Sequence, residues 1–199
     1  MNNTPENVSI LSIESIETSN FINMKRMMYE QKGETKFWDV AQSHDSVAVL
    51  IYNSDKDSYV FVKQFRPPVF MCDTDGMTYE LCAGIVDKDK TLIEIAQEEI
   101  DEECGYECPI ENIHEISSFH SSVGTNGAKQ TVFFALVDDS MKKHVGGGIE
   151  TEDIEVLYVS RTEALELIKD SSKPKALGLA FGVTWFELNY LTMIKEEND

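Results

Sequence analysis

The chain has 199 residues, a length that suits one domain with a full hydrophobic core. Its formal net charge is −19, so we expect no nucleic-acid partner. Hydrophobic residues make up 42% of the sequence, which excludes a disordered acidic tail, and no apolar run is long enough to suggest a membrane partner. The N-terminus lacks a secretory signal pattern and the cysteines form no C-x-x-C pair, so we expect a cytoplasmic protein with reduced thiols.

The N-terminal part of the chain divides into a tail and a hairpin. Residues 1–20 are polar and rich in Ser, Asn and Glu, so we expect a flexible N-terminus. Segments 21–29 and 36–40 are strand-like and flank a turn sequence around Gly33. This pattern predicts a β-hairpin over residues 21–42.

The next apolar segments predict the strands of a core. Residues 47–52 and 59–62 flank a cluster of turn residues, which predicts a buried hairpin. Two prolines at positions 67 and 68 end this hairpin, and residues 79–83 predict a short strand that runs into Gly84.

An amphipathic helix is predicted over residues 92–104. Thr91 and Glu94 have the spacing of a capping box, and Gly105 suits the left-handed residue that ends many helices. Apolar residues recur on one face of this helix, at Ile93, Ala96, Ile100 and Cys104.

The rest of the chain continues to mix strands and helices. Strands are predicted at 113–119, 130–137 and 154–159, a helix begins near Thr162, and a final apolar helix covers 175–194. Hairpins together with helical crossovers indicate an α/β (α+β) layered fold with a mixed sheet, over residues 43–199.

The helix carries an unusual density of negative charge in the sequence EEIDEE, residues 98–103. Helical spacing places Glu99, Glu102 and Glu103 along one flank, where like charges repel. A solvated acidic face is the ordinary interpretation of such a run. However, these acids lie late in the helix, where the macrodipole disfavours them, and residues 91–105 contain no Lys or Arg. The pattern therefore favours a hard divalent cation such as Mg²⁺, which binds carboxylate oxygens.

The spacing of Gly84, Lys90 and residues 98–106 resembles the signature box of the Nudix hydrolases. Residues 79–84 resemble the strand before the box in the nucleoside-diphosphate-sugar branch, which includes the ADP-ribose pyrophosphatases. Flanking stretches at 43–47, 62–67 and 181–186 are more similar to the UDP-sugar diphosphatase (UDP-glucose pyrophosphatase) group. The resemblance implies a Nudix-type α/β/α sandwich with a mixed sheet, to which the N-terminal hairpin is added. It also implies a homodimer in which the hairpin takes part in dimerisation and substrate binding.

Two positions depart from the family pattern. Lys90 stands where the box has an acidic residue, and Glu98 stands where it has an arginine. In the family these positions support the box. A swapped ion pair between Lys90 and Glu98 would restore that support, whereas independent drift of the two positions would leave a weak enzyme.

The resemblance also implies the metal ligands and the reaction. Glu99 and Glu103 would bind Mg²⁺, or Mn²⁺ in its place, together with the backbone carbonyl of Ala83. Glu102 would be a ligand or lie close to the ion. The implied reaction is hydrolysis of a nucleotide sugar, with UDP-glucose giving UMP and glucose 1-phosphate.

A late acidic loop is the implied source of the catalytic base. Glu150 is the first candidate, and Glu152 is the alternative or a further metal contact. The glycines at 146–148 precede it, and their flexibility would let the loop close over substrate.

Candidate substrate contacts come from several segments. Arg66 offers a planar group for a phosphate or ribose, although a surface arginine is an equal alternative. Trp38 would stack on the base across a dimer, although a lone tryptophan more often belongs to the core. Gly84 and Thr125 are further candidates, the latter in a loop at 121–127 that contains two possible turn glycines.

Other functions remain open at this point. An ADP-ribose or ADP-sugar diphosphatase differs only in pockets that sequence does not define. A catalytically weak nucleotide-binding domain would account for the two reversed charges. A calcium-binding protein is disfavoured, because the sequence has no D-x-D-x-D-G loop.

Overall fold

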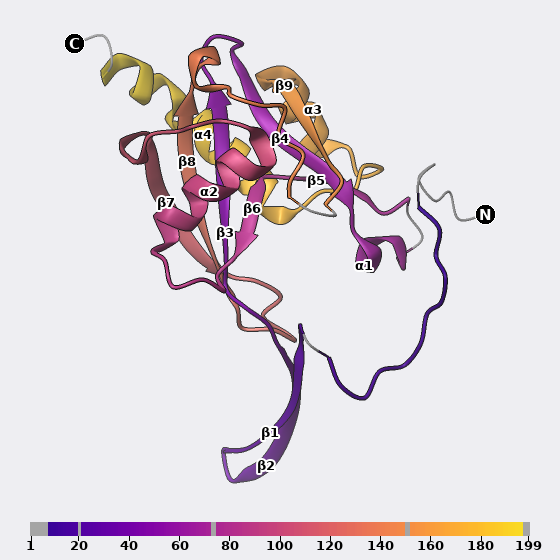
Figure 1. The fold of residues 1–199 in the computed structure, drawn as a ribbon. Helices are drawn as coiled ribbons and strands as arrows, with labels where there is room; N and C mark the ends of the chain where they lie inside the picture. Colours follow the sequence, from indigo (N-terminus) through magenta and orange to yellow (C-terminus); the bar gives the residue numbers. More distant parts are fainter. Residues whose placement is uncertain (1–7, 20, 73–74, 150–151, 197–199) are drawn as a thin grey trace.

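The computed structural model describes residues 8–19, 21–72, 75–149 and 152–196. Among these residues, seven strands form a mixed sheet with helices on both faces, and a two-stranded hairpin projects from one end (Figure 1). This arrangement confirms the predicted mixed α/β fold with an added N-terminal hairpin. Within the described ranges, no helix is long and apolar enough to cross a membrane.

The elements follow one another in a mixed order. The strands are β1 Asn23–Gln31, β2 Glu34–Gln42, β3 Ser46–Asn53, β4 Ser58–Phe65, β5 Met77–Glu80, β6 Cys82–Ile85, β7 Ile113–His120, β8 Lys129–Val137 and β9 Ile154–Ser160. The α-helices are α1 Pro67–Phe70, α2 Leu92–Cys104, α3 Arg161–Lys169 and α4 Leu177–Glu196, and the short 3₁₀ helices are η1 Ile110–Asn112 and η2 Asp139–Met141.

The hairpin β1–β2 has the predicted position, with its turn at Lys32 and Gly33. Both turn residues have positive φ, at 58° and 78°, as the tight turns of twisted hairpins require. The hairpin meets the body of the molecule through Trp38, whose Nε1 donates to the carbonyl of Gly124 at 2.8 Å. Ala41 N also donates to the carbonyl of Thr125 at 2.8 Å.

Strand β3 lies at the centre of the sheet. It pairs antiparallel with β4 and β6 and parallel with β8, and its residues 47–53 are fully buried. Because both of its faces are covered, its sequence is continuously apolar rather than alternating.

The two faces of the sheet form two separate hydrophobic cores. Helix α2 covers one face, where Ile95, Ala96 and Ile100 are buried against β3 and its neighbours. Helices α3 and α4 cover the other face, through Leu167, Val183 and others (Figure 1). The predicted apolar stripe of α2 was incomplete: Ile95 is fully buried, whereas Ile93 is only partly buried.

Two local predictions were wrong. The segment 79–83 forms two strands, because the chain changes partner at the buried residue Leu81: β5 pairs with β4, and β6 pairs with β3. Helix α3 is capped by Ser160 and not by Thr162, since the Ser160 side chain accepts from Glu163 N in a full capping box. The switch at Leu81 matters most, because it places β6 beneath α2.

Candidate active site

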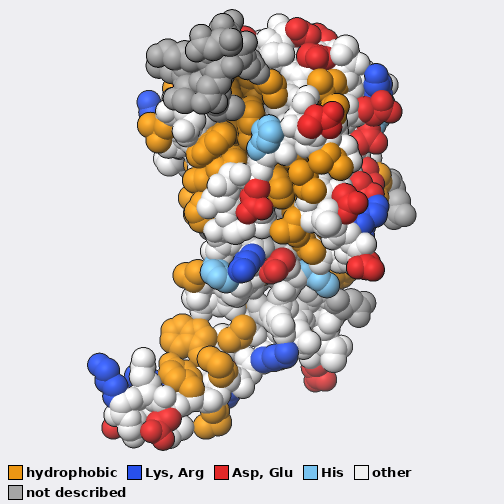
Figure 2. Space-filling view, turned by 90° about the vertical axis from the view of Figure 1, so that its left-hand side faces the viewer, with side chains coloured by type: hydrophobic (Ala, Val, Ile, Leu, Met, Phe, Trp, Pro, Cys, Tyr) orange, Lys and Arg blue, Asp and Glu red, His pale blue; other side chains and the backbone are white. Residues whose placement is uncertain are grey.

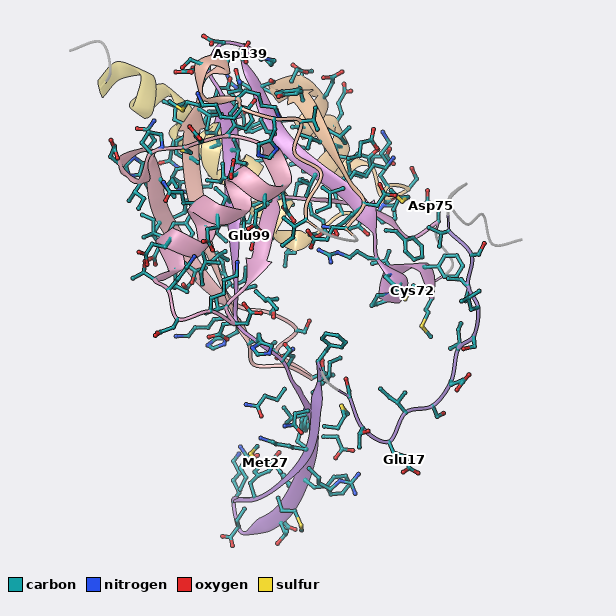
Figure 3. The ribbon with its side chains drawn as sticks, viewed as in Figure 1. Glu17, Met27, Cys72, Asp75, Glu99 and Asp139 are labelled. Atoms are coloured by element: carbon teal, nitrogen blue, oxygen red, sulfur yellow. The ribbon has the colours of Figure 1, made fainter. Side chains whose placement is uncertain are left out.

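Strand β6 and helix α2 meet at Gly84 and Glu99. A Cβ atom at Gly84 would lie 2.0 Å from Glu99 Oε1, so a glycine is required for the carboxylate to approach the strand. Figure 3 labels Glu99 on α2, beside β6. Gly84 was predicted to bind substrate. In the structure it lies against Glu99, and its contact with substrate stays a prediction.

Glu103 lies one turn further along the same face of α2. Its side chain is buried, with an exposed fraction of 3%, and Oε2 accepts a hydrogen bond from the backbone N–H of Ala83 at 3.0 Å. Ala83 precedes Gly84 in β6, so both carboxylates are held against two consecutive residues of one strand.

Burial makes both charges unfavourable. Desolvation, with a smaller contribution from the charge of Glu99, raises the pKa of Glu103 to about 8, although the hydrogen bond from Ala83 acts in the opposite direction. Desolvation and, to a smaller extent, the charge of Glu102 raise the pKa of Glu99 to about 7. Lys88 offsets a part of this rise. Both carboxyls therefore tend to take up a proton near neutral pH, and a bound cation would favour their ionised forms instead.

The donor set fits a hard divalent cation. Mg²⁺ in proteins is usually held by one or two carboxylates and completed by water and substrate phosphate. Glu99, Glu103 and the carbonyl of Ala83 provide such a set, and Glu102 is half-buried on the adjoining flank. In the part of the chain that the structure describes, no group of three or more Asp, Glu, His or Cys side chains is arranged so that it could hold a metal ion.

The two residues that depart from the family pattern are in contact. Lys90 Nζ donates to Glu98 Oε1, and Lys88 Nζ donates to Glu98 Oε2 at 3.2 Å. These lysines lower the pKa of Glu98, with Lys90 as the larger cause. Only the contact between Lys90 and Glu98 was predicted from the sequence; the contact between Lys88 and Glu98 was not. Whether the pair supports catalysis stays a prediction.

Arg66 has a protein partner that the sequence did not indicate. Its Nε and NH2 groups donate to the two carboxylate oxygens of Glu80 at 2.8 and 2.7 Å. Glu80 is buried in β5, so this pair orients the guanidinium at the end of β4. The guanidinium is partly exposed, and its predicted contact with substrate stays a prediction.

Trp38 and Thr125 lie together, away from α2. The Trp38 side chain is 52% exposed and is therefore not a core residue. It contacts the 121–127 loop through Gly124, and Thr125 accepts from the backbone of β2. The structure thus joins the hairpin to this loop but leaves their contact with substrate as a prediction.

The acidic loop approaches the end of α2. Glu150 lies outside the described residues. Glu152 Oε2 accepts from Ile149 N at 2.9 Å, and the charge of Glu152 contributes to the raised pKa values of both Glu99 and Glu103. Among the acids of this loop that the structure describes, Glu152 is therefore the one whose charge raises the pKa of Glu99 and Glu103.

The chain is similar to known proteins of one family. The NUDIX domain family model matches residues 42–178. The uridine diphosphate glucose pyrophosphatase NUDT14 of Bos taurus is 37% identical, over 79% of this chain and 84% of that protein. The protein of the same name from Mus musculus is 34% identical over the same shares. The GDP-mannose pyrophosphatase of Salmonella typhimurium is 31% identical, over 89% of this chain and 92% of that protein.

The raised pKa of Glu103 predicts how the stability of metal-free protein depends on pH. The folded chain binds this proton more tightly than the unfolded chain, whose pKa is near 4.5. The protonated Glu103 therefore stabilises the folded chain fully below pH 4.5, and this stabilisation is lost as pH rises toward about 8. We expect the melting temperature in chelator to fall over this range, and Glu103→Gln to reduce the fall by a few degrees.

Glu115→Gln is the matched control for this measurement, because it removes an exposed carboxylate on β7. It should leave the slope of melting temperature against pH as in the unmodified protein. An unchanged slope in Glu103→Gln would contradict the assignment of a buried, proton-binding carboxyl.

Proposed function

This chain belongs to the Nudix family, and on that premise we propose that it hydrolyses the diphosphate of a nucleotide sugar with Mg²⁺. The preferred substrate is UDP-glucose, and the products are UMP and glucose 1-phosphate. The observation that carries the proposal is a pair of carboxylates held against β6, of which Glu103 is buried and Glu99 is half-buried. The curated relatives, which are named as pyrophosphatases of UDP-glucose and GDP-mannose, support the substrate class.

The proposed ligands of the metal are Glu99, Glu103 and the carbonyl of Ala83, with Glu102 as a ligand or close neighbour. Mn²⁺ would bind in the same way. The bound ion would screen the charge of the diphosphate and polarise the attacked phosphorus. The chain itself must hold the carboxylates in place, which the contacts with Ala83 and Gly84 support, and the bound ion would favour their ionised forms.

Water is the nucleophile of the proposed reaction. It forms a bond to one phosphorus while the bond from that phosphorus to the bridging oxygen breaks, and the electron pair remains on the departing phosphate. A carboxylate takes the proton of the water. Glu150 is the first candidate for this role, and Glu152 is the alternative, supported by its electrostatic effect on Glu99 and Glu103.

Arg66, Gly84, Trp38 and Thr125 complete the proposed set of substrate contacts. The Glu80 carboxylate would hold Arg66 toward a phosphate or ribose. Gly84 lies directly under Glu99, and its backbone would contact substrate beside that carboxylate. We place the protein in the cytoplasm, a proposal supported by the four cysteines, which are all free thiols.

A catalytically weak binding domain is the second candidate function. The reversed charges at Lys90 and Glu98 favour it, because they depart from the family pattern. Their direct contact supports the active enzyme instead, since the ion pair survives with its partners exchanged.

A homodimer is part of the proposal, with the hairpin as its interface. The pairs Met28–Phe37 and Met27–Trp38 lie opposite each other across β1 and β2, and all four side chains are exposed. Figure 2 shows hydrophobic side chains gathered on this projecting hairpin. An isolated two-stranded hairpin is marginally stable in water, so a second copy that covers it would stabilise it.

Light scattering tests the dimer. We expect a molar mass near twice the 22.5 kDa of the chain, and a shift toward the monomer in Met28→Glu. Leu177→Glu, which alters an exposed apolar residue at the start of α4, should remain dimeric. A molar mass of one chain in the unmodified protein would contradict the proposal.

Turnover of a substrate panel tests the activity. UDP-glucose, UDP-galactose, GDP-mannose, ADP-glucose and ADP-ribose are incubated with Mg²⁺ and scored for nucleoside monophosphate. We expect the fastest release from UDP-glucose, no release in chelator, and a loss of about a hundredfold or more in Glu103→Gln. Faster turnover of ADP-ribose would select the ADP-ribose alternative, and no turnover by folded protein would select the binding domain.

A double-mutant cycle tests the exchanged ion pair. Lys90→Glu and Glu98→Arg should each lower kcat/KM about two- to fivefold, because each leaves two like charges in contact. The double variant should regain most of the activity of the unmodified protein, since it recreates the pair with the charges in the family's order and leaves only the repulsion from Lys88. Additive losses in the double variant would show that the two positions act independently.

A further inference from the structure

Residues 142–148 cross the C-terminal end of α2 and bond to its backbone. The last carbonyl groups of a helix have no partner within the helix. Here Gly147 N donates to the carbonyl of Glu103 at 2.9 Å, and Gly148 N donates to the carbonyl of Glu102 at 3.1 Å. The segment therefore holds the main chain of two proposed metal ligands.

Lys142 adds a positive charge at the same helix end. Its Nζ donates to the carbonyl of Cys104 at 2.6 Å, and it lies 4.7 Å from the centre of the Tyr106 ring. The last turn of α2 contains no basic residue of its own. Lys142 therefore supplies the cation that the negative end of the helix dipole favours.

The fit between this segment and α2 is backbone against backbone. A Cβ atom at Gly146, where φ is +76°, would lie 2.3 Å from the carbonyl oxygen of Glu103. A Cβ atom at Gly105, where φ is +69°, would lie 2.1 Å from the carbonyl oxygen of His144. Neither obstacle is the end of a flexible side chain, so a side chain at either position would push the segment away from α2.

The same segment carries the turn that bears Glu152. A Cβ atom at Gly148, where φ is +83°, would lie 2.5 Å from Glu152 Oε2. That oxygen also accepts from Ile149 N, so the carboxylate folds back onto the glycine. All three glycines at 146–148 have positive φ, and their predicted role in closing the loop over substrate stays a prediction.

We propose that residues 142–148 are a positioning element of the metal site. By holding the backbone of Glu102 and Glu103 from outside the helix, this element sets the affinity of the site for a divalent cation. It contributes no ligand of its own. The inference rests on the proposed function, which assigns Glu99, Glu102 and Glu103 to the metal.

Calorimetric titration of Mn²⁺ into the full-length protein without nucleotide tests the inference. Gly146→Ala should weaken Mn²⁺ binding about tenfold or more, as expected when groups that orient ligands are removed. Gly33→Ala is the strain-matched control: Gly33 has nearly the same φ, +78°, and a Cβ there would have nothing within 4 Å. It should bind Mn²⁺ as the unmodified protein does, even if its melting temperature falls.

A second pair of variants introduces no collision. Lys142→Met removes the Nζ donor to Cys104 and should weaken Mn²⁺ binding about threefold, whereas Lys142→Arg should restore it. Lys143→Met is the control, because Lys143 Nζ donates to the carbonyl of Ser140 and not to α2. If Gly146→Ala does not fold, the comparison of Lys142→Met with Lys143→Met tests the positioning role by itself.

The outcomes of these titrations distinguish failure of the proposed function from failure of the positioning role. No Mn²⁺ binding by the unmodified protein would overturn the proposed function and this inference with it. Mn²⁺ binding that is equally tight in Lys142→Met and in folded Gly146→Ala would overturn the positioning role alone. Weaker binding in both, with unchanged binding in Gly33→Ala and Lys143→Met, would support it.

Discussion

The structure depends on holding two carboxylates, the half-buried Glu99 and the buried Glu103, against the backbone of one strand. Such burial is costly without a counter-charge, and it raises the pKa of both groups. Several features of the fold follow from it. The chain changes sheet partner at Leu81 so that β6 lies under α2, and Gly84 has no side chain where Glu99 must fit.

The acids of α2 fall into two groups with different surroundings. Two of the outward-facing acids have basic neighbours: Glu98 contacts Lys88 and Lys90, and Asp101 lies 3.0 Å from His144 Nε2. The inward-facing acids, Glu99 and Glu103, have no such pair among the ion pairs of the described residues. The negative charge is thus balanced where α2 meets solvent and left unbalanced where it meets β6, which is the distribution that a cation site requires.

Local signals in the sequence predicted the elements well, because each depends on residues close together in the chain. The capping box of Thr91 and Glu94 and the left-handed Gly105 mark the two ends of α2, and both are present. Contacts between distant residues were not predictable in this way. Lys142, which bonds to Cys104, and Glu80, which holds Arg66, become neighbours of their partners only through the tertiary fold. The roles of the site residues stay predictions, because their contacts with metal and substrate involve groups outside the chain.

The position of a bound cation tests the central claim most directly. Crystals soaked in Mn²⁺ can be measured at a wavelength where manganese scatters anomalously. We expect an anomalous peak bounded by the carboxylates of Glu99 and Glu103 and the carbonyl of Ala83. A peak at another acidic cluster, with none at these three groups, would contradict it.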